Sequence, residues 1–112
     1  MKKNISILLL FMMLVSCAPT NMYYWGNYGQ ATYQHNKSQS EKTNAELLIV
    51  FEDIINKKHK GIRNAVPPGI YADYGFFLIK DGQITKGKEM LEKELFLYPE
   101  SKKVVEYILN KL

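Results

Sequence analysis

Apolar side chains recur through much of the chain at the three- and four-residue spacing of amphipathic helices. The clearest pattern follows Thr43-Asn44-Ala45-Glu46, a capping-box sequence in which Thr43 and Glu46 would satisfy free amides at a helix start. We expect Lys57, Lys58 and Lys60 in the last turn of this helix, and Gly61 as its stop. The predicted buried face consists of Leu47, Leu48, Phe51, Ile54 and Ile55.

Three further helices are predicted towards the C-terminus. One runs from about Pro68 to Lys80, a turn follows at Asp81-Gly82, and the next runs from about Thr85 to Tyr98 before Pro99. Ser101 is placed to cap a last helix that covers the open end of the stack. The predicted apolar contacts are Tyr71, Tyr74, Phe77 and Leu78, then Met90, Leu91, Leu95 and Leu97, and finally Val104, Val105, Ile108, Leu109 and Leu112.

An aromatic segment precedes these helices. Its spacing, with Trp25, Tyr28 and Tyr33, favours a helix that runs to about Asn36, although two glycines weaken that prediction. Trp25-Gly26-Asn27-Tyr28-Gly29 also matches Tyr71-Ala72-Asp73-Tyr74-Gly75, as aromatic-x-x-Tyr-Gly. Each copy would begin a helix that is followed by an amphipathic partner, which is typical of repeated helical hairpins.

The first sixteen residues form a different kind of segment. Lys2 and Lys3 precede an apolar run of about 11 residues, which suits a signal peptide and is too short for a membrane span of roughly 20. Leu14-Val15-Ser16-Cys17 closes the run with the only cysteine of the chain. This resembles a bacterial lipobox, which implies cleavage between Ser16 and Cys17 and lipidation of the Cys17 thiol. An ordinary secretory leader is the alternative.

The second hairpin resembles a tetratricopeptide repeat over about 68–101. Tyr71, Tyr74, Gly75 and Leu78 fall on first-helix positions, Gly82 in the turn, Gly87 and Leu91 on second-helix positions, and Pro99 on the closing proline. Glu94 departs, because the pattern has a small alanine there. The first copy matches only at Trp25, Tyr28 and Gly29 and through the helix after Thr43. The resemblance implies an all-α fold of two tetratricopeptide-like hairpins and a C-terminal capping helix, preceded by a signal-peptide helix.

The Tyr-Tyr-Trp-Gly-x-Tyr and Gly-Ile-Tyr-Ala-Asp-Tyr-Gly segments also resemble a bacterial family of small lipoproteins of unknown function. That family accompanies other small envelope lipoproteins, including relatives of a curli-secretion pore component, so the resemblance implies envelope partners and no activity. Ala18 after the cysteine, by resemblance to lipoproteins of Gram-negative envelopes, favours the periplasmic face of the outer membrane. The implied organisation is a signal peptide (1–16), a lipidated tether (17–22) and a helical domain (23–112).

Composition argues against several classes of function but does not identify one. The net charge of +4 falls to +2 without the leader, at 13 basic against 11 acidic residues, which argues against nucleic acid as a partner. We expect no metal and no cofactor, because His35 and His59 are the only histidines and are expected at solvated helix ends. We also expect no catalytic residue: the carboxylate pairs Glu52-Asp53 and Glu92/Glu94 are interpreted as solvated faces.

Two features leave alternatives open. The aromatic residues Tyr23, Tyr24, Trp25, Tyr28, Tyr71 and Tyr74 are candidate partner-binding residues for a peptide or glycan, or else they pack the hairpins together. The basic cluster Lys57-Lys58-His59-Lys60 with Arg63 either contacts anionic headgroups near the anchor or decorates a helix end. The expected function is a membrane-anchored, non-enzymatic protein-interaction adaptor whose partners are envelope lipoproteins or outer-membrane proteins. A glycan- or peptide-binding lipoprotein is the alternative, and a small hydrolase is a weaker one.

Overall fold

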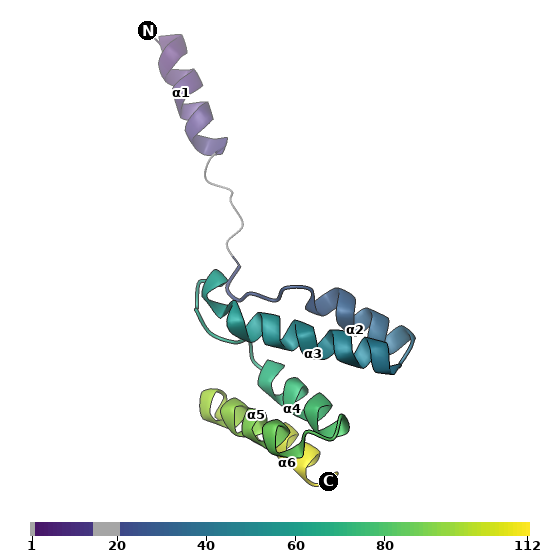
Figure 1. The fold of residues 1–112 in the computed structure, drawn as a ribbon. Helices are drawn as coiled ribbons and strands as arrows, with labels where there is room; N and C mark the ends of the chain where they lie inside the picture. The colour runs from purple at the N-terminus through teal and green to yellow at the C-terminus, as the bar shows by residue number, and fades with distance from the viewer. Residues whose placement is uncertain (1, 15–20) are drawn as a thin grey trace.

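The computed structural model describes residues 2–14 and 21–112, whose regular elements are all helices, with no strand (Figure 1). The predicted all-α class is therefore confirmed. None of the described helices has the length and apolar character needed to cross a membrane. The predicted lipidation and cleavage residues, Cys17 and Ser16, lie outside the described residues. The elements are α1 (Lys2–Leu14), α2 (Tyr28–Lys37), α3 (Glu41–Asn56), η1 (Lys58–Lys60), α4 (Ile70–Lys80), α5 (Ile84–Leu97), η2 (Pro99–Ser101) and α6 (Lys102–Leu109).

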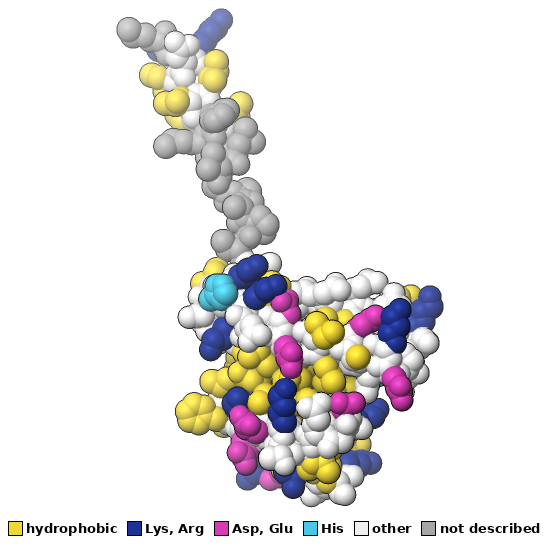
Figure 2. Space-filling model, in the orientation of Figure 1, with side chains coloured by type: hydrophobic (Ala, Val, Ile, Leu, Met, Phe, Trp, Pro, Cys, Tyr) yellow, Lys and Arg dark blue, Asp and Glu magenta, His cyan; other side chains and the backbone are white. Residues whose placement is uncertain are grey.

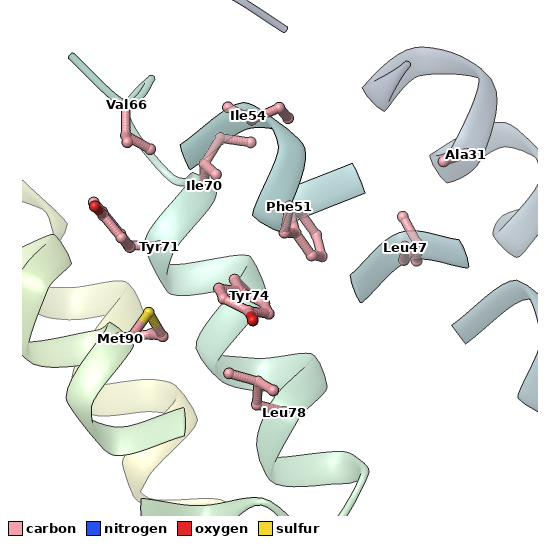
Figure 3. Packing of buried hydrophobic residues seen from close by; sticks show 10 residues of the cluster. All are labelled: Ala31, Leu47, Phe51, Ile54, Val66, Ile70, Tyr71, Tyr74, Leu78 and Met90. Carbon is pink, nitrogen blue, oxygen red and sulfur yellow. The ribbon is translucent and has the colours of Figure 1, made fainter. Parts of the chain in front are cut away.

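The helices after α1 pack in sequence order. Helix α2 lies against α3, α4 lies against α5, and α6 packs beside the second pair (Figure 1). The main core fills the space between α3 and α4, where apolar faces from both pairs meet (Figure 3). Its buried members are Ala31, Leu47, Phe51, Ile54, Val66, Ile70, Tyr71, Tyr74, Leu78 and Met90. A second cluster of Ala72, Leu91, Val105 and Ile108 joins α6 to the α4–α5 pair.

Two glycines bring α4 and α5 into close contact. A Cβ atom on Gly75 would lie 2.7 Å from the carbonyl oxygen of Gly87, and one on Gly87 would lie 2.8 Å from the carbonyl oxygen of Gly75. Each glycine therefore faces the backbone of the other helix, where no larger residue fits. Gly29, the counterpart of Gly75 in the first aromatic-x-x-Tyr-Gly copy, has no neighbour within 4 Å of the same position. The two copies thus differ in how tightly their helices pack.

Helix α3 begins earlier than predicted. Its N-cap is Ser40, whose hydroxyl accepts a hydrogen bond from the Thr43 amide, while the Thr43 hydroxyl accepts one from the Ser40 amide. The capping box is therefore Ser40–Thr43, and the prediction of Thr43–Glu46 is wrong. Ser40 adopts the extended conformation of an N-cap, which leaves Thr43 as the third helical residue.

The end of α3 also differs from its prediction. The helix ends at Asn56 with no basic residue in its last turn, so Lys58 and Lys60 belong to η1. Gly61 is not a left-handed stop, since its φ is −88°. A Cβ atom there would lie 2.8 Å from the Cα of Tyr23, so the glycine is needed where the N-terminal segment crosses it.

Other boundaries shift by a few residues. Helix α2 begins at Tyr28, because Gly26 has a φ of 50° and Trp25 lies in the turn before the helix. Helix α4 begins at Ile70, behind Gly69 at a φ of 90°. Ser101 makes no cap for α6, whose Val105 and Ile108 are buried. The predicted contacts of Leu97, Val104, Leu109 and Leu112 are wrong, because all four are exposed.

Candidate functional site

A concave surface lies over α4, between α3 and η1 on one side and α5 on the other. It consists of two hollows with volumes of about 590 and 300 Å³, which are adjacent because Tyr71 and Lys93 line both; the two hollows together are called the groove between α3 and α5. In Figure 2, hydrophobic side chains are visible in the band between the upper and lower helix pairs, with acidic and basic side chains on both sides. The larger hollow is lined by Lys58, Tyr71, Glu89, Glu92, Lys93, Phe96 and Leu97, and the smaller by Glu52, Ile55, Asn56, Tyr71, Tyr74, Lys86, Met90 and Lys93.

A polar bridge crosses the smaller hollow. The Tyr74 hydroxyl donates a 2.7 Å hydrogen bond to Glu52 Oε1, and Lys86 Nζ lies 3.4 Å from the same oxygen and 5.5 Å above the Tyr74 ring. The hydrogen bond from Tyr74, with Lys86 nearby, lowers the pKa of the Glu52 carboxyl, whereas burial and Glu52 raise the pKa of Tyr74. This bridge connects α3, α4 and α5 across one end of the groove.

The larger hollow has an exposed aromatic edge. Phe96 is 86% exposed and Leu97 is also exposed, although both belong to a well-formed helix. Their neighbours on the rim carry both charges, and Lys93 lies 3.2 Å from Glu89. An apolar surface with a mixed polar rim suits the side chains of a protein partner. The described residues that line this groove are aromatic, aliphatic, basic and acidic, with one asparagine.

The predicted aromatic binding residues do not share one surface. Tyr74 is only 2% exposed and Tyr71 is also buried, so both serve mainly as core and groove floor (Figure 3). Trp25 is 43% exposed and packs on Tyr28, with ring centroids 5.5 Å apart. Tyr23 and Tyr24 are half-buried beside the α3–α4 connector. Tyr71 and Tyr74 therefore pack the hairpins together, and a role of the six aromatic residues in binding a partner stays a prediction.

Tyr28 and Asp73 connect the two helix pairs. The Tyr28 hydroxyl donates a 3.1 Å hydrogen bond to Asp73 Oδ2. Burial, with the Asp73 charge added, raises the pKa of Tyr28 to about 12. Burial also raises the pKa of the Asp73 carboxyl. The hydrogen bond from Tyr28 lowers this pKa, and the nearby charge of Glu94 raises it further. Asp73 is thus a partly buried carboxyl group whose ionised form the surrounding domain disfavours.

Glu94 is the residue that the sequence interpretation missed. It is 0% exposed, so its assignment to a solvated carboxylate face is wrong. Its Oε1 accepts hydrogen bonds of 2.8 Å from the Gly69 amide and 2.8 Å from the Ser101 hydroxyl, while Oε2 is buried without a partner among the described residues. The carboxylate also lies at the N-terminus of α4, where the helix dipole favours negative charge. The departure of Glu94 from the repeat pattern was the available signal.

The two histidines have different surroundings. His35 was predicted to be solvated, but it is buried, with Nδ1 3.3 Å from the Thr43 hydroxyl and its ring edge-on to Phe77. His59 is exposed in η1. Within residues 2–14 and 21–112, no group of three or more histidine, cysteine or acidic side chains is arranged to hold a metal ion.

Comparison with known proteins gives one match. A family model described as a domain of unknown function, DUF4810, matches residues 22–108, which is most of the chain. No curated protein and no solved structure matches the chain. The matched range contains α2 to α5, the groove, Glu94 and nearly all of α6. The chain therefore belongs to the DUF4810 family, whose function is unknown.

Proposed function

We propose that this chain is a lipid-anchored, non-enzymatic adaptor of the cell envelope. Cys17 carries the lipid, after cleavage behind Ser16, and holds the domain on the periplasmic face of the outer membrane. The helical domain binds a partner protein in the groove between α3 and α5. Other envelope lipoproteins or outer-membrane proteins are the expected partners.

The observation that carries the adaptor proposal is the exposure of Phe96 on the rim of the larger hollow. A phenylalanine that is 86% exposed on a well-formed helix contributes little to the fold, and aromatic side chains dominate binding hot spots. The hollow beside it, about 590 Å³, is large enough to receive one or two side chains of a partner.

The packing of the second helix pair supports a tetratricopeptide-like hairpin. Gly75 and Gly87 approach each other's backbone at the positions that the repeat pattern reserves for small residues. Pro99 follows the end of α5, as the pattern requires. Glu94 replaces the small residue at which a further repeat would pack, and its bonds to Gly69 and Ser101 are consistent with a short stack that ends at α6.

Co-purification of the lipidated protein from detergent-solubilised membranes tests the adaptor proposal. We expect the double variant Phe96→Ser/Leu97→Ser to recover at least tenfold less of the co-purifying partner protein, because the variant lacks the apolar rim. The matched control is Val104→Ser/Tyr107→Ser, which removes exposed apolar side chains from α6 and should retain the partner. Recovery of the same proteins with both variants, or of lipid alone with the unmodified chain, would count against the proposal.

The position of Trp25 is the one observation that favours the glycan-binding alternative. Its half-exposed ring, which packs on Tyr28, is the kind of surface on which a sugar can stack. Binding to purified cell-wall sacculi that Trp25→Ala abolishes and Phe96→Ser/Leu97→Ser preserves would favour this alternative over the adaptor.

A further inference from the structure

One end of the domain presents a basic surface beside the N-terminal segment. We define this basic end by Lys58, Lys60, Ile62, Arg63 and Met22, all of which are exposed. Ile62 is 68% exposed, so an aliphatic side chain stands among the cations. In Figure 2, basic side chains gather at the end of the domain from which the N-terminal segment departs.

Three cations of the basic end form no ion pair among the described residues, although the charge of Lys60 also acts on Asp53 at longer range. Lys57 is paired with Asp53 at 2.6 Å, but Lys58, Lys60 and Arg63 have no acidic side chain within 4.0 Å in the described chain. Lys60 lies 5.5 Å above the Tyr24 ring, and Arg63 lies 5.8 Å from the Tyr23 ring. The aromatic segment thus holds two cations in place without cancelling their charge.

Decoration of the end of α3 does not explain these residues, since Lys58 and Lys60 belong to the short helix η1 that follows it and Arg63 lies beyond both helices. A cation stabilises a helix C-terminus only within about the last turn. Helix α3 ends at Asn56 and has no basic residue in its last turn, while the three unpaired cations belong to η1 and the connector that follows. Their shared position on one surface needs another reason.

The basic end also lies close to the proposed anchor. The Ile62 amide donates to the Asn21 carbonyl at 3.1 Å, and the Arg63 amide donates to the Met22 carbonyl at 3.1 Å, so the connector is fixed to the start of the domain. Cys17 precedes Asn21 by four residues, which span at most about 14 Å when fully extended. A lipidated Cys17 therefore keeps Asn21, and with it the connector that is hydrogen-bonded to Asn21 and Met22, close to the membrane.

We infer that the basic end lies against anionic phospholipid headgroups, with Ile62 at the level of the interface. Charge complementarity and the short tether identify a lipid surface as the occupant. This orientation rests on the lipid anchor of the proposed function. This orientation also determines where the groove lies relative to the membrane. Because Lys58 lines the larger hollow as well, the groove opens next to the membrane.

Spin-label depth measurements on the full lipidated chain in nanodiscs test the inference. Because Cys17 is acylated, Ile62→Cys supplies the single reactive thiol for a nitroxide, and Tyr107→Cys on α6 is the matched control. In discs containing phosphatidylglycerol, we expect the label at 62 to be shielded from an aqueous nickel relaxant and the label at 107 to stay in water. Each cation near an anionic surface strengthens association by about fivefold, so Lys58→Gln/Lys60→Gln/Arg63→Gln should lower the docked-to-undocked ratio by about 100-fold.

The outcomes separate the inference from the anchor. High salt or purely zwitterionic discs should release the label at 62 without any substitution. A lipidated chain whose label at 62 stays in water in anionic discs overturns the orientation and leaves the adaptor proposal standing. Mass spectrometry that finds no lipid on Cys17 overturns both.

Discussion

At the scale of single residues, Glu94 connects three parts of the domain. Its carboxylate accepts hydrogen bonds from the start of α4 and from η2, and removing it would leave the Gly69 amide and the Ser101 hydroxyl without their partner. We expect Glu94→Ala to lower the free energy of unfolding by about 3 kcal/mol. Chemical denaturation at pH 7 measures this.

Two matched variants test whether the hydrogen bonds of Glu94 are responsible. Glu92→Ala removes an exposed carboxylate from the same helix and should change the stability by less than about 0.5 kcal/mol. Glu94→Gln keeps the Oε1 acceptor and should recover most of the loss. Equal effects of Glu92→Ala and Glu94→Ala would show that the buried hydrogen bonds do not matter.

Asp73 makes stability depend on pH in the direction opposite to a salt-bridged carboxylate. Its pKa is raised in the folded state, chiefly by burial, so the folded chain takes up a proton at a higher pH than the unfolded chain does. Above the pKa that Asp73 has in the folded chain, its ionised carboxylate therefore lowers the free energy of unfolding. This loss of stability disappears as the pH falls from the folded-state pKa to the lower pKa of the unfolded chain.

Asp73→Asn removes the charge and keeps an acceptor for the Tyr28 hydroxyl. We expect this variant to be more stable than the unmodified chain at pH 7, with the difference shrinking as the pH falls. Thermal unfolding followed by circular dichroism between pH 7 and pH 4 measures both curves. Lower stability of Asp73→Asn at pH 7 would contradict the assigned cause.

Buried polar residues were the hardest to predict from the sequence. Glu94 has lysines nearby in the chain and so looked solvated, and His35 looked like a helix-end residue. Their burial depends on partners far along the chain, namely Gly69 for Glu94 and Phe77 for His35. Periodicity reports which face of one helix is apolar, but it does not report which polar groups another element supplies.

At the scale of elements, the α4–α5 pair depends on the contact between its two glycines. We expect Gly87→Ala to destabilise the domain by about 2 kcal/mol, because the new Cβ would lie 2.5 Å from Ile79 Cγ1 and 2.8 Å from the Gly75 carbonyl oxygen. Gly29→Ala is the control, since its Cβ meets nothing within 4 Å and alanine favours the helix by up to about 1 kcal/mol. Opposite signs for the two substitutions are the expected result, and a neutral Gly87→Ala would contradict the close contact.

The helices themselves were largely predictable, and their ends were less so. The apolar spacing of Leu47, Phe51 and Ile54 identified α3 correctly, since all three are buried. The helix start was misplaced because Ser40 and Thr43 are both competent caps, and the sequence alone does not choose between them. Gly61 resembled a helix stop, but its role depends on the distant Tyr23, which no local pattern reveals.

At the scale of the whole molecule, the account joins an anchor, a membrane-facing end and a groove. The proposed lipid anchor on Cys17 can be tested separately. The precursor with Cys17→Ser should stay uncleaved and should not incorporate labelled palmitate, because the acceptor thiol is absent. Normal maturation of this variant would show that the lipobox interpretation is wrong.

The groove between α3 and α5 was not predictable from the sequence. Tyr71 and Tyr74 were predicted as parts of an exposed aromatic surface, whereas both are buried and line the floor between two helix pairs. The exposed Phe96, the residue on which the functional proposal depends, follows the apolar spacing of α5 poorly and gave no repeat signal. Its significance comes from the hollow beside it.

Photo-crosslinking from position 96 in living cells tests the central claim most directly. Phe96 is replaced by a photoreactive phenylalanine, and Tyr107 on α6 is replaced in the same way as the control, since both side chains are highly exposed. The adaptor account predicts a discrete envelope-protein adduct from position 96 and none of that mass from position 107. No protein adduct from position 96, or the same adducts from both positions, would contradict it.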